Sequence, residues 1–249
     1  MPLVAALAAG CRVMLKPSET TPCTADFLAE FLQKLFPPEQ VATIVGGADV
    51  GEVFSRLPFD HLFYTGSTAV GRLVMRAAAE NLTPVTLDLG GKSPCIIGED
   101  AALPSAVASV VYGKLLNAGQ TCIAPDYVLL PRRLLDDFVD VTTATVQEFY
   151  PTLKDNRDYT SIVNERHYRR IAQYVAEAKA SGARVTEINP GCEALPAETR
   201  KLMPTLVIEP CDRMRSSPAL RSVPSAAATC PCGRLRSSIN ASWPVGATA

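Results

Sequence analysis

The sequence predicts an α/β protein whose first part forms a parallel, doubly wound sheet. Two observations lead to this prediction. Short apolar runs that suit buried strands alternate, over residues 12–89, with segments whose apolar residues recur at helical spacing. Glycine, proline and small polar residues separate these segments, as turns between strands and helices require. A chain of 249 residues is long enough for one large domain or two small ones.

The first part of the chain contains four expected strands and three expected helices. The strands are short, largely apolar runs bounded by turn residues: 12–15, 41–45, 59–64 and 84–89. The helices between them are 24–35, 49–56 and 68–80. In the first helix Phe27, Phe31 and Leu35 share one face, and Pro37-Pro38 ends the helix because proline cannot continue it.

After the glycine pair Gly90-Gly91 the pattern changes, and a domain boundary is expected there. The second part contains expected strands at 95–97, 127–130, 184–188 and 204–208, and expected helices at 103–116, 134–150 and 164–180. The domains predicted from the sequence are therefore 1–90, 91–214 and a tail at 215–249. The tail is rich in Ser, Arg, Ala and Pro without helical or strand periodicity, so it is expected to be disordered.

Charge and cysteine content exclude several classes of protein. With 24 basic and 25 acidic residues the net charge is -1, which provides no basic surface for nucleic acid or an anionic membrane. The eight cysteines are scattered, so reduced thiols and a cytoplasmic location are expected. The two histidines, His61 and His167, have no Cys, Asp or Glu at ligand spacing, and no metal site is expected.

Two residues are candidates for covalent catalysis. Cys122 follows the small-residue turn Asn117–Thr121, and a thiolate in such a turn can attack a carbonyl carbon. Asp88 ends an apolar strand beside Gly90-Gly91, where a carboxylate has room to activate water. The alternatives are a buried free cysteine and an aspartate that only caps or pairs locally.

Four segments, in this order, resemble the NAD(P)-dependent aldehyde dehydrogenases, and most of all their fatty and aromatic, coniferyl-type branch. They are Leu15–Glu19, Phe63–Gly71, Thr86–Pro94 and Asn117–Cys122, and the likeness runs from about residue 3 to about residue 214. The resemblance implies a partial Rossmann-type cofactor-binding domain followed by part of an α/β catalytic domain.

The resemblance also implies an activity: oxidation of an aldehyde to a carboxylic acid through a cysteine thiohemiacetal and a thioester. Cys122 would be the nucleophile. Asp88 would activate water where the family has Glu, with a reach shorter by about one C–C bond, roughly 1.5 Å. The implied cofactor is NAD, with NADP possible, and its expected contacts are Lys16, Ser18, Glu19, Gly66, Ser67, Leu89 and Gly90. Glu19 would repel a 2′-phosphate and so favour NAD.

The chain departs from the family pattern at both ends. No counterpart of the family's oxyanion-binding Asn precedes the first motif, and Ser216–Ser222 stands where a Glu-Glu-Ile-Phe-Gly-Pro segment is expected. These departures suggest the central part of a longer enzyme, with a shifted reading frame near Arg215. Two alternatives stay open: a non-catalytic fragment, and a relative that passes its acyl group to coenzyme A. The expected partners are a small aldehyde and, for the parent enzyme, other copies of itself.

Overall fold

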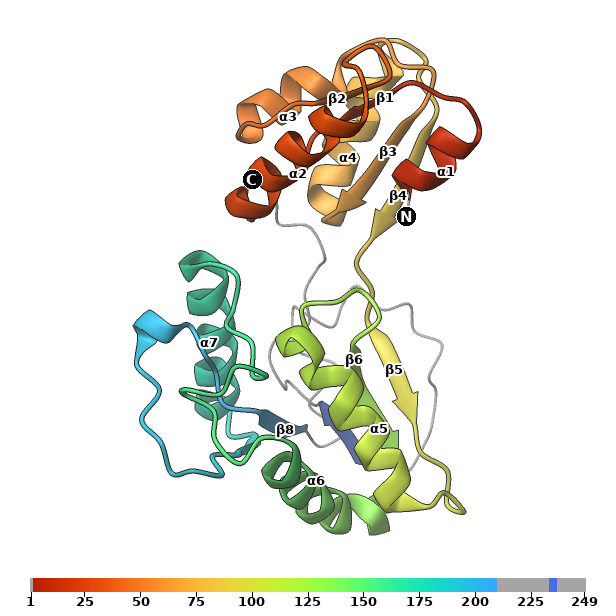
Figure 1. The fold of residues 1–249 in the computed structure, drawn as a ribbon. Coiled ribbons are helices and arrows are strands. Elements are labelled where there is room, and N and C mark those ends of the chain that lie inside the picture. The colour runs from red at the N-terminus through yellow and green to blue at the C-terminus, as the bar shows by residue number, and fades with distance from the viewer. Residues whose placement is uncertain (1, 210–232, 237–249) are drawn as a thin grey trace. The chain divides into compact units, whose positions relative to one another are not determined.

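The computed structural model describes residues 2–209 and 233–236 (Figure 1). These residues fall into two compact units, one within Met1–Gly90 and the other within Gly91–Trp243. Helices and strands alternate through both, so the predicted α/β class is confirmed. In the described part of the chain, no helix is both long and apolar enough to cross a membrane.

The first unit contains eight elements. They are α1 (Pro2–Ala8), β1 (Val13–Leu15), α2 (Pro22–Leu35), β2 (Val41–Thr43), α3 (Ala48–Ser55), β3 (Leu62–Gly66), α4 (Thr68–Ala79) and β4 (Val85–Leu89). β1 pairs with β2 and β3 pairs with β4, both in parallel, as predicted. The prediction of one continuous sheet is wrong, because these are two separate two-stranded sheets. β1 and β2 have only three residues each, which leaves few backbone groups to extend a ladder.

Helix α4 packs closely on the β3–β4 pair because a glycine faces the sheet. A Cβ atom added at Gly71 would lie 2.9 Å from Leu89 Cδ2, closer than real Cβ contacts allow. At the end of β3, a Cβ added at Gly66 would collide with the hydroxyl of Tyr64. These glycines let the end of β3 and the first turn of α4 pack closely against the side chains of Tyr64 and Leu89.

The second unit is a mixed five-stranded sheet with helices. Its strands are β5 (Ser93–Ile96), β6 (Pro125–Leu130), β7 (Arg184–Glu187), β8 (Thr205–Glu209) and β9 (Gly233–Arg236). Its helices are α5 (Leu103–Leu115), α6 (Leu135–Phe149) and α7 (Glu165–Ala180), with short 3₁₀ helices η1 (Leu116–Gly119), η2 (Arg132–Leu134) and η3 (Ala197–Thr199). The strand order is β5-β6-β9-β8-β7, and only β5 and β6 are parallel.

The core of the second unit joins helices α5 and α6 to the sheet. Val107, Val111 and Leu115 of α5 are fully buried together with Phe138 of α6 and Val128 of β6. The spacing of four residues between the α5 positions is the helical period that the sequence predicts. This packing places the end of α5 directly before the turn that carries Cys122.

Part of the predicted tail has a defined place. Gly233–Arg236 forms β9, antiparallel to both β6 and β8, so the expectation of a disordered tail is wrong for these four residues. A four-residue strand between two others is stabilised by backbone hydrogen bonds on both edges, which need no apolar periodicity. The rest of the tail, and the proposed frame shift near Arg215, lie outside the described residues.

Candidate active site

Cys122 is an exposed free thiol in the turn between η1 and β6. The backbone before it is unusual: Asn117 and Ala118 have φ of 52° and 53°, and Gly119 has φ of 73°. A left-handed conformation costs a residue other than glycine about 1–3 kcal/mol, and such strain collects at functional sites. The sequence predicts the freedom of Gly119 but not the left-handed conformation of the two residues before it.

Gly91, the second glycine of the pair Gly90-Gly91, lies against the turn that carries Cys122. A Cβ atom at Gly91 would sit 3.3 Å from the backbone oxygen of Cys122, a tight contact. Glycine at position 91 therefore allows the start of the second unit to approach the backbone of the thiol-bearing turn.

Three charged side chains near this turn were not predicted from the sequence. Lys114, in the last turn of α5, is only 1% exposed, and burial lowers its pKa to about 8, while the charge of Asp126 partly opposes the shift. Asp126 is itself buried and forms an ion pair with Lys92, Nζ to Oδ2 3.4 Å. Position 114 lies on the same helical face as the buried Val107 and Val111, but lysine is rarely buried, so the residue type argues against what the periodicity indicates.

Cys95 and Cys122 differ in how far they are exposed to solvent. Cys95 is half-buried in β5, and burial raises the pKa of its thiol, an effect that Lys114 partly opposes. A thiol with a raised pKa is a poorer source of thiolate. Cys122 is exposed and is therefore the more accessible of these two thiols.

Asp88 belongs to the first unit and lies at the end of β4, where its side chain is exposed. Its neighbour across the parallel ladder is Thr65 of β3. Asp88 belongs to the first unit and Cys122 to the second. The predicted position of a carboxylate at the end of a strand is confirmed, while its role as a base stays a prediction.

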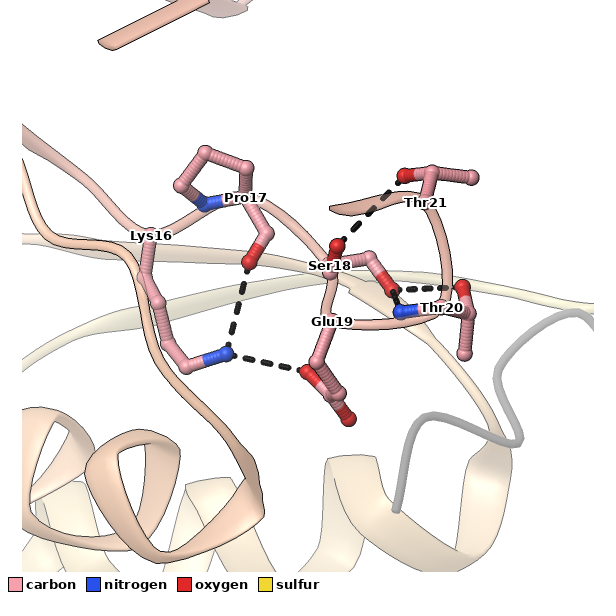
Figure 2. Close-up of polar contacts among 6 residues, drawn as sticks. All are labelled: Lys16, Pro17, Ser18, Glu19, Thr20 and Thr21. Carbon is pink, nitrogen blue, oxygen red and sulfur yellow. Dashed lines mark hydrogen bonds and ion pairs between the residues drawn. The ribbon is translucent and has the colours of Figure 1, made fainter. Parts of the chain in front are cut away.

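The segment after β1 forms a compact polar turn (Figure 2). Lys16 Nζ donates to Glu19 Oε2 at 3.1 Å and to the carbonyl of Pro17 at 3.3 Å. Both charged side chains are largely shielded, with exposed fractions of 12% for Lys16 and 26% for Glu19. The structure thus brings two predicted cofactor contacts together.

Ser18 makes its hydrogen bonds within this turn and does not cap the next helix. The sequence allows Ser18 to cap the following helix, but α2 begins at Pro22 with Thr21 in the N-cap position. The Ser18 hydroxyl instead accepts from the backbone N–H of Thr20 at 3.2 Å and shares a hydrogen bond with its side chain (Figure 2). Proline suits the first helical turn, so α2 begins beyond the serine, and the role of Ser18 as a cofactor contact stays a prediction.

The remaining predicted cofactor contacts gather around the start of α4. The buried Ser67 is the N-cap of α4, and its Oγ accepts from the backbone N–H of Val70 at 3.1 Å. Gly66 precedes it and is the register partner of Leu89 on β4, which Gly90 follows. The first turn of α4 presents backbone N–H groups and the positive end of a helix dipole. Among the described residues, no group of three or more His, Cys, Asp or Glu side chains could hold a metal ion.

Comparisons with known proteins identify the family of this chain. Residues 1–216 match the model of the aldehyde dehydrogenase family. A probable coniferyl aldehyde dehydrogenase of Caulobacter vibrioides is 54% identical over 215 residues, covering 86% of this chain and 44% of that protein. Among solved structures, the substrate-bound state of Staphylococcus aureus AldH matches with TM-score 0.76 and 37% identity, covering 82% of this chain and 43% of that one.

A second solved structure shows the family with a cofactor. The aldehyde dehydrogenase of Mycobacterium tuberculosis complexed with NAD⁺ matches with TM-score 0.69 and 35% identity, covering 80% of this chain and 42% of that one. The chain therefore spans less than half the length of each of these three proteins. The matched family model covers most of the sequence, and the chain belongs to the aldehyde dehydrogenase family.

Proposed function

We propose that this chain carries the nucleophile and the cofactor-binding segments of an enzyme that oxidises an aldehyde to a carboxylic acid with NAD. The observation that carries the proposal is the exposed thiol of Cys122 directly after a turn with three successive positive φ angles. Strained backbone beside an accessible nucleophile is typical of active sites. Family membership supports the class of reaction.

The residues of this chain would act in sequence. The thiolate of Cys122 adds to the aldehyde carbon, and the carbonyl electron pair moves to oxygen, giving a thiohemiacetal. A nicotinamide held by this chain would supply the hydride acceptor, and Cys122 would then carry the oxidised carbon as a thioester. Asp88 takes one proton from the water that attacks the thioester, so that the acid is released and Cys122 leaves as the thiolate with which the reaction began. The proton on Asp88 then passes to solvent.

The turn after β1 and the start of α4 fit a dinucleotide. An ammonium has three N–H donors, and two of those on Lys16 are engaged by Glu19 and Pro17, which leaves one for a ribose hydroxyl. The N-terminus of α4, capped by Ser67, suits a pyrophosphate. The carboxylate of Glu19 disfavours a 2′-phosphate, so we propose NAD over NADP.

We further propose an aromatic aldehyde of the coniferyl type as substrate. The Caulobacter relative, which is named a probable coniferyl aldehyde dehydrogenase, supports this choice.

The test is a search for the acyl intermediate. The full chain is mixed with NAD⁺ and coniferyl aldehyde, quenched in acid, digested and mapped by mass spectrometry, with NADH measured in parallel. We expect an acyl group on Cys122 and at least as much NADH as adduct, because each acylation releases one NADH and hydrolysis removes adduct. Cys122→Ala should lose both the adduct and the NADH, whereas Cys23→Ala, which removes an exposed thiol of the first unit, should keep both.

Addition of coenzyme A tests the acyl-transfer alternative, which predicts an acyl-CoA product. Absence of adduct and NADH from the wild-type chain would contradict the proposal.

A further inference from the structure

The turn that carries Cys122 is tied to a distant segment by one side chain, that of Gln120. Its Nε2 donates to the carbonyl of Asn117 at 3.0 Å and to the carbonyl of Ser161 at 3.1 Å. Its Oε1 accepts from the backbone N–H of Val163 at 2.9 Å. Its own backbone N–H also donates to Asn117 O at 3.0 Å. The orientation of the amide follows from its partners, because carbonyls require a donor and an N–H requires an acceptor.

The segment that Gln120 holds is itself anchored on its other side. The backbone N–H of Ile162 donates to the carbonyl of Arg200 at 2.8 Å, and Arg200 Nε donates back to the carbonyl of Ile162 at 2.9 Å. Ile162 is 1% exposed and belongs to a small core cluster with the fully buried Ala118. Residues 161–163 are therefore a fixed support, and the turn meets it through Ala118 and Gln120.

We propose that Gln120 is a positioning residue that holds the Cys122 turn in its left-handed conformation by clamping it to residues 161–163. This inference rests on the proposed role of Cys122 as nucleophile. Two of the three left-handed residues, Asn117 and Ala118, carry a Cβ atom and disfavour that conformation, so contacts outside the turn must maintain it. Gln120 supplies these contacts from a position two residues before the thiol. Loss of the amide releases the turn, and the thiol then spends less time in the geometry that makes it reactive.

The experiment compares three variants of the full chain. Gln120→Met keeps the length of the side chain and removes both amide functions. Gln120→Glu keeps the acceptor and removes the donors. Gln173→Met is the matched control, because Gln173 is exposed on α7 and its Nε2 donates to Glu177 Oε1 of the same helix at 2.8 Å.

The first measurement is the labelling rate of Cys122 by dipyridyl disulfide, relative to the exposed Cys23 of the first unit. We expect this ratio to fall at least about fivefold in Gln120→Met, because fivefold is the factor for one hydrogen bond and this variant loses three, and to stay unchanged in Gln173→Met. In Gln120→Glu the ratio should recover between about pH 7 and pH 4, because a protonated carboxyl donates again. Gln120→Met has no such recovery, and a purely structural role predicts none in either variant.

The second measurement separates this inference from the proposed function. Amide exchange at Val163 should accelerate in Gln120→Met and not in Gln173→Met, which tests the clamp without reference to the thiol. If wild-type Cys122 labels no faster than Cys23, the proposed function fails. If it labels faster but its ratio stays the same in both Gln120 variants, the positioning role is overturned. If Gln120→Met does not fold, the pH dependence of Gln120→Glu decides alone.

Discussion

Asp88 occupies the position where the family resemblance leads us to expect glutamate, which is longer by one methylene. The effect of this shorter side chain on the release of the acid can be measured. Its carboxylate is exposed at the end of β4. A general base must come within hydrogen-bond distance of the water that it activates, or reach it through one further water. In the proposed reaction a shorter side chain makes the direct contact harder, so we expect release of the acid from the thioester to be the slow step.

Asp88→Glu is therefore expected to accelerate release of the acid, and Asp88→Asn to slow it by about 100-fold or more, the usual contribution of a general base. Both should leave acylation of Cys122 unchanged. Rapid-quench mass spectrometry, which follows the decay of the Cys122 adduct, measures these rates. A slower decay in Asp88→Glu would show that the site is built around the shorter acid.

The buried Lys114 makes a second prediction at the same scale. Burial lowers its pKa from 10.5 to about 8, against the opposing charge of Asp126, and a difference of this size corresponds to about 3 kcal/mol. Below about pH 8 the side chain is protonated in both states and the cost of the buried charge is present in full. Between about pH 8 and 10.5 the unfolded chain binds more protons than the folded one, so the free energy of unfolding rises with pH.

Lys114→Met should remove this rise. Urea unfolding between pH 7.5 and 10 is expected to show wild-type stability gaining on the variant by up to about 3 kcal/mol. Lys179→Met is the control, because it removes a half-exposed lysine ion-paired to Glu187 at 2.6 Å and should keep the wild-type pH dependence. If the free energy of unfolding depends on pH in the same way in wild type and Lys114→Met, the lowered pKa of Lys114 is contradicted.

At the scale of elements, one side-chain cap in each unit offers a matched comparison. Ser67 Oγ accepts from the backbone N–H of Val70 at the start of α4, and Asn164 Oδ1 accepts from that of His167 at the start of α7, at 2.9 Å. Each cap satisfies one of the backbone donors that a helix leaves unpaired at its first turn.

Ser67→Ala is expected to cost about 1 kcal/mol and to accelerate amide exchange in α4 but not in α7. Asn164→Ala should do the reverse. Because the start of α4 is also the proposed pyrophosphate site, only Ser67→Ala should weaken NAD binding in calorimetry. Equal exchange effects in both helices from either variant would show that the two units do not open separately.

For the whole molecule, the position of β9 predicts how the chain tolerates truncation. The sequence alone predicts that removal of the tail leaves the remainder unchanged. In the structure β9 lies between β6 and β8, and each of them would lose a ladder partner. An exposed strand edge also favours association between chains.

Deletion of residues 233–249 is therefore expected to lower the free energy of unfolding of the second unit and to promote aggregation. Deletion of 237–249, which keeps β9, is the control and should have neither effect. Urea unfolding and light scattering measure the two outcomes. Equal behaviour of the two truncations would show that β9 does not support the sheet.

Local pattern by itself determined a large part of this protein. The α/β class and the alternation of elements follow from apolar periodicity and turn residues, which act over a few neighbouring positions. The same local chemistry points to Cys122 in its turn, to Asp88 at a strand end and to Ser67 as a helix start.

Tertiary structure decided what depends on partners far apart in the chain. The left-handed Asn117 and Ala118 are held by contacts with residues more than 40 positions later, and no window of the sequence encodes such a pairing. Lys114 looks like a solvent-facing helix residue until the sheet and Asp126 surround it. Backbone hydrogen bonds decide that β1–β2 and β3–β4 form separate pairs and that β9 lies between β6 and β8. These bonds do not depend on side-chain periodicity, so the sequence pattern does not predict them.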